Sequence, residues 1–195
     1  MRTVYFPGAG GRACFWEPVA RRVGGDALLL GWPGFGDEPS DPAIRTLQQL
    51  TTWAEKRLQG PCDLVAQSMG GVIALQLALH RPELVRRLVL VATSGGVDVA
   101  RLGAEDWRPD YARELTAVPR WFVDDRTDVT DRLGEVRAPT LLLWGDADRV
   151  SPVAVGRFLQ QRIRDAELLI IPGGTHAVAA ERPDDVAPLI ARHLA

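Results

Sequence analysis

A single serine stands between a strand-like run and a helix-like run in the segment Leu64-Val65-Ala66-Gln67-Ser68-Met69-Gly70-Gly71. The pattern small-x-Ser-x-Gly is typical of a nucleophile elbow, a strained strand-to-helix turn that exposes the serine hydroxyl. Such a turn brings the residues two before and two after the serine into contact, so small residues are needed, and Ala66 and Gly70 meet this need. The turn also leaves the Met69 N–H at a helix N-terminus, where negative charge is favoured. The segment therefore predicts a nucleophilic Ser68 with an oxyanion-stabilising N–H at Met69.

Short apolar runs alternate with helix-like segments along the rest of the chain. The strand-like runs are 3–6, 26–30, 63–66, 88–92, 140–144 and 168–171. They are continuously apolar, which is typical of strands buried on both faces of a parallel sheet. Helical periodicity covers residues 44–58, 155–163 and 186–194. Residues 70–80 are apolar almost all round, which predicts a helix packed deep against the sheet. This alternation predicts an α/β fold, doubly wound around a mostly parallel six-stranded sheet, in one domain over residues 1–195.

The composition narrows the class of protein. The 195 residues are 46% hydrophobic and 25% charged, and the net charge is −2. Neither a basic surplus nor a run of roughly 18 apolar residues is present, so we expect no nucleic-acid or membrane partner. The start of the chain lacks the apolar stretch of a signal peptide, and we expect a cytoplasmic protein. No Cys/His spacing indicates a metal, and the oligomeric state stays open.

One connection is much longer than a crossover requires. Residues 95–138 contain no strand-like run but four aromatic residues, Trp107, Tyr111, Trp121 and Phe122. Because long insertions in compact domains are usually functional or disordered, and aromatic residues argue against disorder, we interpret this segment as a small helical cap. Its aromatic residues, Trp121 and Phe122 in particular, either line an acyl pocket or only pack within the cap. Trp32, in the turn Trp32-Pro33-Gly34-Phe35-Gly36, is a further candidate substrate contact.

An acid and a base are predicted near Ser68. Asp148 follows the strand-like run 140–144, and His176 follows the next run, 168–171. Parallel strands place their carboxyl ends at one edge of the sheet, so both side chains should lie beside Ser68. The spacing Gly-x-x-Asp-x-x-x-Pro favours Asp148 as the acid. Two alternatives remain, Asp146 in the same turn and Asp98 after the preceding strand.

Five segments together resemble the α/β-hydrolase superfamily over nearly the whole chain outside the cap. They are Phe6-Pro7-Gly8-Ala9-Gly10-Gly11, Trp32-Pro33-Gly34-Phe35-Gly36, Gln67-Ser68-Met69-Gly70-Gly71, Gly145-Asp146-Ala147-Asp148 with Pro152, and Gly173-Gly174-Thr175-His176. The resemblance implies that Ser68 is the nucleophile, His176 the general base and Asp148 its orienting acid. It also implies the strand order 2-1-3-4-5-6, without the two opening strands common in the family.

The oxyanion loop departs from the family pattern. By resemblance the second oxyanion N–H, beside that of Met69, belongs to Ala9. The histidine that the family usually carries before the loop glycine is Pro7 here, and the glycine that usually opens the elbow is Ala66. Because proline has no N–H and fixes φ, the loop is expected to differ slightly in shape.

The expected function is that of a serine hydrolase which cleaves a small or medium carboxylic ester through an acyl-enzyme on Ser68. Its partner is a small-molecule acyl substrate, and no cofactor or metal is implied. Two alternatives remain. One is a lyase or acyltransferase that uses the same triad, and the other is a ligand-binding protein without hydrolytic activity.

Overall fold

Six parallel strands form one sheet in the computed structural model, which describes residues 1–114, 119 and 121–195. The spatial order is β2-β1-β3-β4-β5-β6, as predicted, and every neighbouring pair is parallel. The strands are β1 (Arg2–Phe6), β2 (Asp26–Leu29), β3 (Cys62–Gln67), β4 (Val85–Val91), β5 (Thr140–Gly145) and β6 (Ala166–Ile171). The order reverses at β1 and β3, and the segment after each of these strands contains a predicted site residue.

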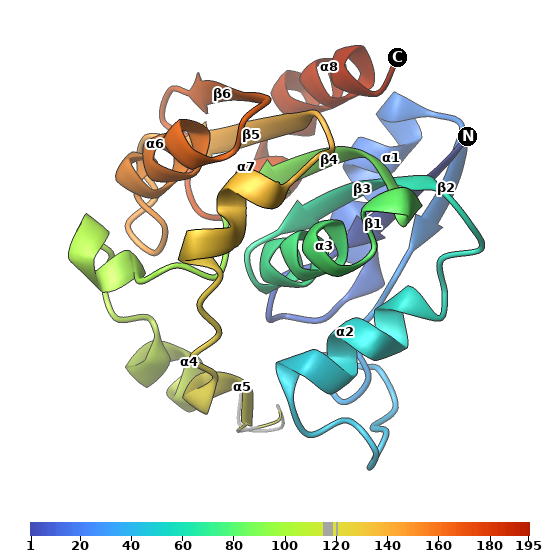
Figure 1. Ribbon diagram of the computed structural model, residues 1–195. Coiled ribbons are helices and arrows are strands. Elements are labelled where there is room, and N and C mark those ends of the chain that lie inside the picture. The colour runs from blue at the N-terminus through green and yellow to red at the C-terminus, as the bar shows by residue number, and fades with distance from the viewer. Residues whose placement is uncertain (115–118, 120) are drawn as a thin grey trace.

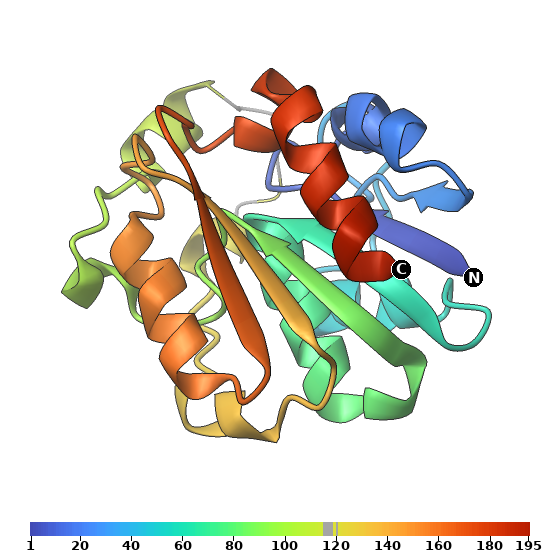
Figure 2. The ribbon, with the colours of Figure 1, turned by 90° about the horizontal axis from the view of Figure 1, so that it is seen from above.

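Helices cover both faces of the sheet (Figures 1 and 2). One face packs against α2 (Leu47–Glu55), α3 (Met69–His80) and α6 (Val153–Arg162). The other packs against α1 (Glu17–Val23), α7 (Val178–Glu181) and α8 (Pro183–Leu194). Two hydrophobic cores result, one on each side of the strands, as expected for a doubly wound α/β fold.

The helices differ from prediction mainly at their ends. The predicted helix 44–58 spans only Leu47–Glu55. It begins at Leu47 because the Thr46 side chain accepts a hydrogen bond from the Gln49 N–H and caps the helix there. Helix α3 follows the prediction closely, and every residue from Met69 to Leu79 is buried. Helix α1 was not predicted, since only two of its residues, Val19 and Ala20, are buried and the apolar signal is correspondingly weak.

The long connection between β4 and β5 contains short helices in its described part. These are α4 (Arg108–Glu114), α5 (Trp121–Asp124) and two 3₁₀ helices, Val99–Leu102 and Thr130–Glu135. Residues 115–118 and 120 of the predicted cap lie outside the described residues. Figure 1 shows α4 and α5 together at the periphery, away from the sheet.

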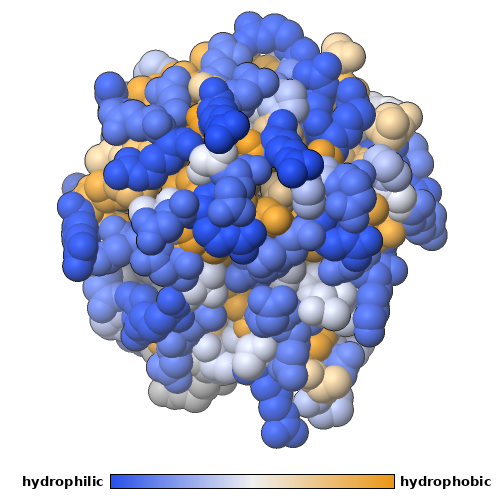
Figure 3. Space-filling model, in the orientation of Figure 1, coloured by the Kyte–Doolittle hydropathy of each residue, from blue (hydrophilic) through white to orange (hydrophobic). Residues whose placement is uncertain are grey.

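The face in Figure 3 is mostly hydrophilic, with apolar residues scattered between charged ones. In the described part of the chain, Met1 and Ile170 are the large hydrophobic residues with exposed side chains. None of the helices described is both long enough and apolar enough to cross a membrane.

Candidate active site

Ser68 occupies a strained turn between β3 and α3. Its backbone angles are φ 52° and ψ −120°, a region that residues other than glycine seldom adopt. Strain of this kind costs about 1–3 kcal/mol and persists only where the surroundings enforce it. Here the Ser68 N–H donates to the Val91 carbonyl at 3.1 Å, and the Thr93 hydroxyl donates to the Ser68 carbonyl at 2.6 Å. The neighbouring strand β4 and the residues after it therefore hold the turn in place.

Gly70 is required because the backbone of β1 passes close to the first turn of α3. A Cβ at Gly70 would lie 2.5 Å from the Pro7 carbonyl oxygen and 2.7 Å from the Phe6 carbonyl oxygen. The sequence pattern predicts a small residue here because of contact with Ala66. The three atoms nearest to a Cβ at position 70 belong instead to Pro7 and Phe6, and the third is the Phe6 Cβ at 2.9 Å. The small residue at position 70 thus lets α3 start directly beside the loop that follows β1.

His176 joins Ser68 to Asp148 through two hydrogen bonds. The Ser68 Oγ lies 3.0 Å from His176 Nε2, and His176 Nδ1 lies 2.9 Å from Asp148 Oδ2. An ionised carboxylate only accepts hydrogen bonds, so Nδ1 carries the proton and Nε2 is free to accept the serine proton. The side chain of Asp148 is fully buried, whereas that of His176 is 28% exposed. The arrangement can move a proton from Ser68 to a histidine whose orientation is fixed from behind.

The three candidate acids have different hydrogen-bond and ion-pair partners in the structure. Besides His176, Asp148 accepts backbone N–H groups from Val150 and Ser151, both at 2.9 Å, on Oδ1. Asp146 is exposed and accepts the Gly173 N–H, so it caps a turn. Asp98 forms an ion pair with Arg101 at 2.9 Å. Of these three carboxylates, that of Asp148 contacts the imidazole.

The loop after β1 lies against Ser68. A Cβ on Gly8 would come within 3.0 Å of the Ser68 Cβ, and Ala9 and Met69 both line the cavity that contains the serine. Two side chains hold this loop by its carbonyl groups. Trp32 Nε1 donates to Pro7 at 2.9 Å, and the hydroxyl of Tyr111 donates to Ala9 at 3.1 Å.

Burial raises the pKa of Tyr111, which keeps its hydroxyl protonated and able to donate. Pro7 has no N–H to donate, and the two side chains tether the loop through carbonyl oxygens, in addition to the hydrogen bond from the Trp32 N–H to the Gly11 carbonyl at 2.9 Å. A tyrosine of the long connection thus holds the loop that carries the predicted second oxyanion donor.

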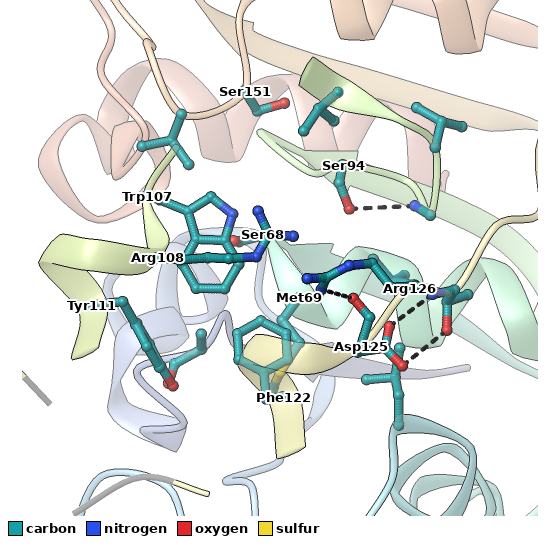
Figure 4. Close-up of a pocket in the computed structure, with 18 of the residues that line it drawn as sticks. Ser68, Met69, Ser94, Trp107, Arg108, Tyr111, Phe122, Asp125, Arg126 and Ser151 are labelled. Carbon is teal, nitrogen blue, oxygen red and sulfur yellow. Dashed lines mark hydrogen bonds between the residues drawn. The ribbon is translucent and has the colours of Figure 1, made fainter. Parts of the chain in front are cut away.

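A cavity of about 750 Å³ opens at Ser68, a size typical of small-molecule sites. Figure 4 shows Trp107, Tyr111 and Phe122 along its wall, and Trp107 and Phe122 stack with ring centroids 5.3 Å apart. Phe122 therefore lies where a substrate contact was predicted.

The other two predicted substrate contacts, Trp32 and Trp121, are not among the residues that line this cavity. Trp32 is fully buried and packs edge-on against Phe6, because its indole N–H must reach the Pro7 carbonyl. Trp121 packs against Phe35, with ring centroids 5.7 Å apart.

Gln67 is a site residue that sequence reasoning missed. Its Nε2 donates to the His176 carbonyl at 3.1 Å and so holds the loop that carries the histidine. The two residues are 109 positions apart, and no local pattern signals their contact. In the described part of the chain, no group of three or more His, Cys, Asp or Glu side chains could hold a metal ion.

Comparisons with known proteins agree with this architecture. An 81-residue segment, 41% of the chain, is 41% identical to a Synechocystis protein provisionally named non-heme chloroperoxidase, of which it covers 28%. A pimeloyl-[acyl-carrier protein] methyl ester esterase of Nitrosomonas europaea is 26% identical over 78% of each chain. The crystal structure of a hydrolase from Pseudomonas aeruginosa superposes with a TM-score of 0.81 at 21% identity, covering 99% of this chain and 89% of the other.

The model of the alpha/beta hydrolase family matches residues 4–189, which include the end of β1, the Ser68 turn and the segments that carry Asp148 and His176. This match spans nearly the whole chain, and the sheet has the strand order that the resemblance implied. The chain belongs to the alpha/beta hydrolase family.

Proposed function

We propose that the protein is a serine hydrolase that cleaves a small or medium carboxylic ester through an acyl-enzyme on Ser68. The observation that carries the proposal is the hydrogen-bonded series Ser68–His176–Asp148 at the wall of a cavity of about 750 Å³. A cavity of that size accommodates an ester of several carbon atoms, and its aromatic wall suits an apolar acyl or alcohol group.

Acylation begins when Ser68 Oγ attacks the ester carbon. His176 Nε2 takes the serine proton, and Asp148 stabilises the imidazolium that forms. The electron pair of the carbonyl moves onto its oxygen, and the N–H groups of Ala9 and Met69 stabilise the resulting oxyanion. Collapse of this intermediate breaks the ester bond, and His176 returns its proton to the departing alcohol. The acyl group is left on Ser68.

Deacylation repeats these steps with water as the nucleophile. His176 removes a proton from water, the hydroxide attacks the acyl carbon, and the carboxylic acid leaves as Ser68 regains its proton. The name of the Nitrosomonas relative, a methyl ester esterase, supports ester cleavage as the reaction class.

Labelling with a fluorophosphonate and turnover of p-nitrophenyl esters of graded chain length test the proposal. We expect the wild-type protein to be labelled and to hydrolyse the esters, and Ser68→Ala to lose both. Ser94→Ala is the matched control, because Ser94 lines the same cavity but its Oγ accepts the Gly96 N–H instead of contacting His176. The control should keep the label.

Two results would count against hydrolysis. Absence of both label and turnover in a folded protein contradicts the proposal. Labelling at Ser68 without turnover of any ester would instead favour a lyase, an acyltransferase or a binding protein that retains the triad.

A further inference from the structure

Two arginines, Arg108 and Arg126, lie in the wall of the cavity that contains Ser68. Arg108 begins α4 and Arg126 follows α5. Figure 4 shows both side chains extending from opposite sides toward the part of the cavity where Ser68 and Met69 lie. Hydrolysis of a neutral ester by the proposed mechanism uses neither guanidinium group, so their placement calls for another explanation.

The two guanidinium groups converge on one carbonyl oxygen. Arg108 Nε donates to the Val123 oxygen at 3.2 Å, and Arg126 Nη1 donates to the same atom at 3.0 Å. Like charges held this close repel each other, and the repulsion is larger beside an apolar wall than in bulk water. The exposed Asp106 carboxylate, which pairs with Arg108 and also interacts with the charge of Arg126, offsets part of this repulsion. An anion between the two guanidinium groups would offset more of it, so the arrangement favours a negatively charged ligand.

Both arginines keep N–H groups available for such a ligand. In the described part of the chain, Arg126 donates to the Val123 and Asp125 carbonyls and has no ion-pair partner. Arg108 has one ion pair, with Asp106 at 3.2 Å, and the Asp106 side chain is 62% exposed. Because a guanidinium carries five N–H donors, each arginine has several left.

The carboxylates in the same wall are already engaged by other partners. Their partners are Arg101 for Asp98, Arg113 for Asp110, Thr127 for Asp125 and Thr130 for Asp128. The Asp125 carboxylate accepts the Thr127 N–H on Oδ2 at 3.1 Å and the Thr127 hydroxyl on Oδ1 at 3.2 Å. The aspartates therefore do not occupy the donors of the two arginines.

We infer that the substrate ester carries a carboxylate, which Arg108 and Arg126 bind while Ser68 attacks the ester carbon. The planar guanidinium fork matches a carboxylate in two parallel hydrogen bonds. The stacked rings of Trp107 and Phe122 lie along the same wall and suit the apolar part of such a molecule. The substrate is thus either a half-ester of a dicarboxylic acid or an ester of a carboxylate-bearing alcohol. This inference rests on the proposed ester hydrolysis.

Matched pairs of chromogenic esters test the inference and distinguish the two sources of the carboxylate. p-Nitrophenyl valerate and p-nitrophenyl hemiglutarate differ only by a methyl group replaced by a carboxylate on the acyl side. 4-Nitrophenyl valerate and 3-carboxy-4-nitrophenyl valerate make the corresponding pair on the alcohol side. The measured quantity is the ratio of kcat/KM for the charged ester to that for the neutral ester, after subtraction of the uncatalysed rate.

For at least one of the two ester pairs, we expect the ratio of charged to neutral kcat/KM to be about tenfold lower in Arg126→Gln and in Arg108→Gln than in the wild type. Loss of one charge-assisted hydrogen bond predicts a change of this size. Added salt should lower the wild-type ratio by screening the charges. Arg157→Gln removes the same charge from an exposed position on α6 outside the cavity and should keep the wild-type ratio. Circular dichroism checks that each variant is folded.

The outcomes separate the two proposals. If Ser68-dependent hydrolysis of the valerate ester is observed but neither cavity variant changes either ratio relative to Arg157→Gln, the inference is overturned and ester hydrolysis stands. If folded wild-type protein hydrolyses none of the esters, both are overturned.

Discussion

Replacing Asp148 by asparagine changes one atom of the site and should abolish most of its activity. Asp148 Oδ1 accepts the N–H groups of Val150 and Ser151, both at 2.9 Å. In Asp148→Asn the amide oxygen must take this position, since an NH₂ group there would face two donors. The NH₂ group is then forced toward His176 Nδ1, where the carboxylate oxygen lay at 2.9 Å.

The consequence is the wrong tautomer of the imidazole. A donor facing Nδ1 makes this nitrogen an acceptor and places the ring proton on Nε2, 3.0 Å from Ser68 Oγ. His176 can then no longer accept the serine proton. Loss of the correct tautomer in a serine–histidine–aspartate triad lowers kcat by about 10⁴-fold, or about 5 kcal/mol in the activation free energy.

The assay is steady-state hydrolysis of p-nitrophenyl valerate, with circular dichroism to confirm that each variant is folded. Asp146→Asn is the matched control, because Asp146 is exposed and bonds Gly173 rather than the imidazole. It should keep kcat within a few-fold of the wild type. The reasoning is refuted if Asp148→Asn retains more than a tenth of the wild-type kcat, or if the control loses as much as Asp148→Asn does.

Three further predictions concern stability and the loop after β1. Gly70→Ala should lower the free energy of unfolding in urea by about 1–3 kcal/mol through overpacking against the Pro7 carbonyl, although alanine normally favours a helix. Gly10→Ala, where a Cβ meets no atom within 4 Å, should be nearly neutral, and equal losses would contradict the packing argument. Trp32→Phe leaves the buried Pro7 carbonyl without its indole donor, so the free energy of unfolding should fall by about 1–3 kcal/mol. The loop after β1 should then move and lower kcat. An unchanged kcat would show that the loop does not need this hydrogen bond. Burial lowers the pKa of His193 in the folded protein, so on acidification the imidazole is protonated at a higher pH in the unfolded chain than in the folded one. The free energy of unfolding should therefore fall as the pH drops below about 6.5. His193→Gln should flatten this part of the stability–pH curve, and a curve that keeps its full slope would rule out His193 as the cause.

The sequence alone was enough to predict the framework of the site. Ser68 is marked by a local pattern, because a strained strand-to-helix turn admits few residue types beside it. Asp148 and His176 could be placed from topology, since parallel strands bring their carboxyl ends to one edge of the sheet. The continuous apolar runs predicted six strands, and the sheet has six, in the order that the resemblance implied. The prediction that all six are buried was wrong for the two edge strands, because β2 and β6 each have only one neighbouring strand and stay partly exposed.

The predictions failed where the outcome depended on the direction of a side chain. Trp32 was expected in the pocket, but its indole turns into the core to reach the Pro7 carbonyl. Nothing in the residues around Trp32 specifies that direction, because its hydrogen-bond partner belongs to another strand's loop. Phe122 lines the cavity while its neighbour Trp121 does not, and adjacent aromatic residues in a sequence give no sign of this difference.

The residue pattern along the chain was thus sufficient for the fold, the strained serine turn and the edge of the sheet where Ser68, Asp148 and His176 meet. The supporting contacts of the site and the side chains that line its cavity became visible only in the folded molecule. Gln67 reaches the His176 carbonyl across 109 positions, and Tyr111 reaches the Ala9 carbonyl across 102. Arg108 and Arg126 meet at one carbonyl of the long connection. Local patterns arise because backbone geometry repeats along the chain with the period of a helix or a strand. These contacts depend instead on how distant segments pack, and that packing leaves no periodic pattern in the sequence.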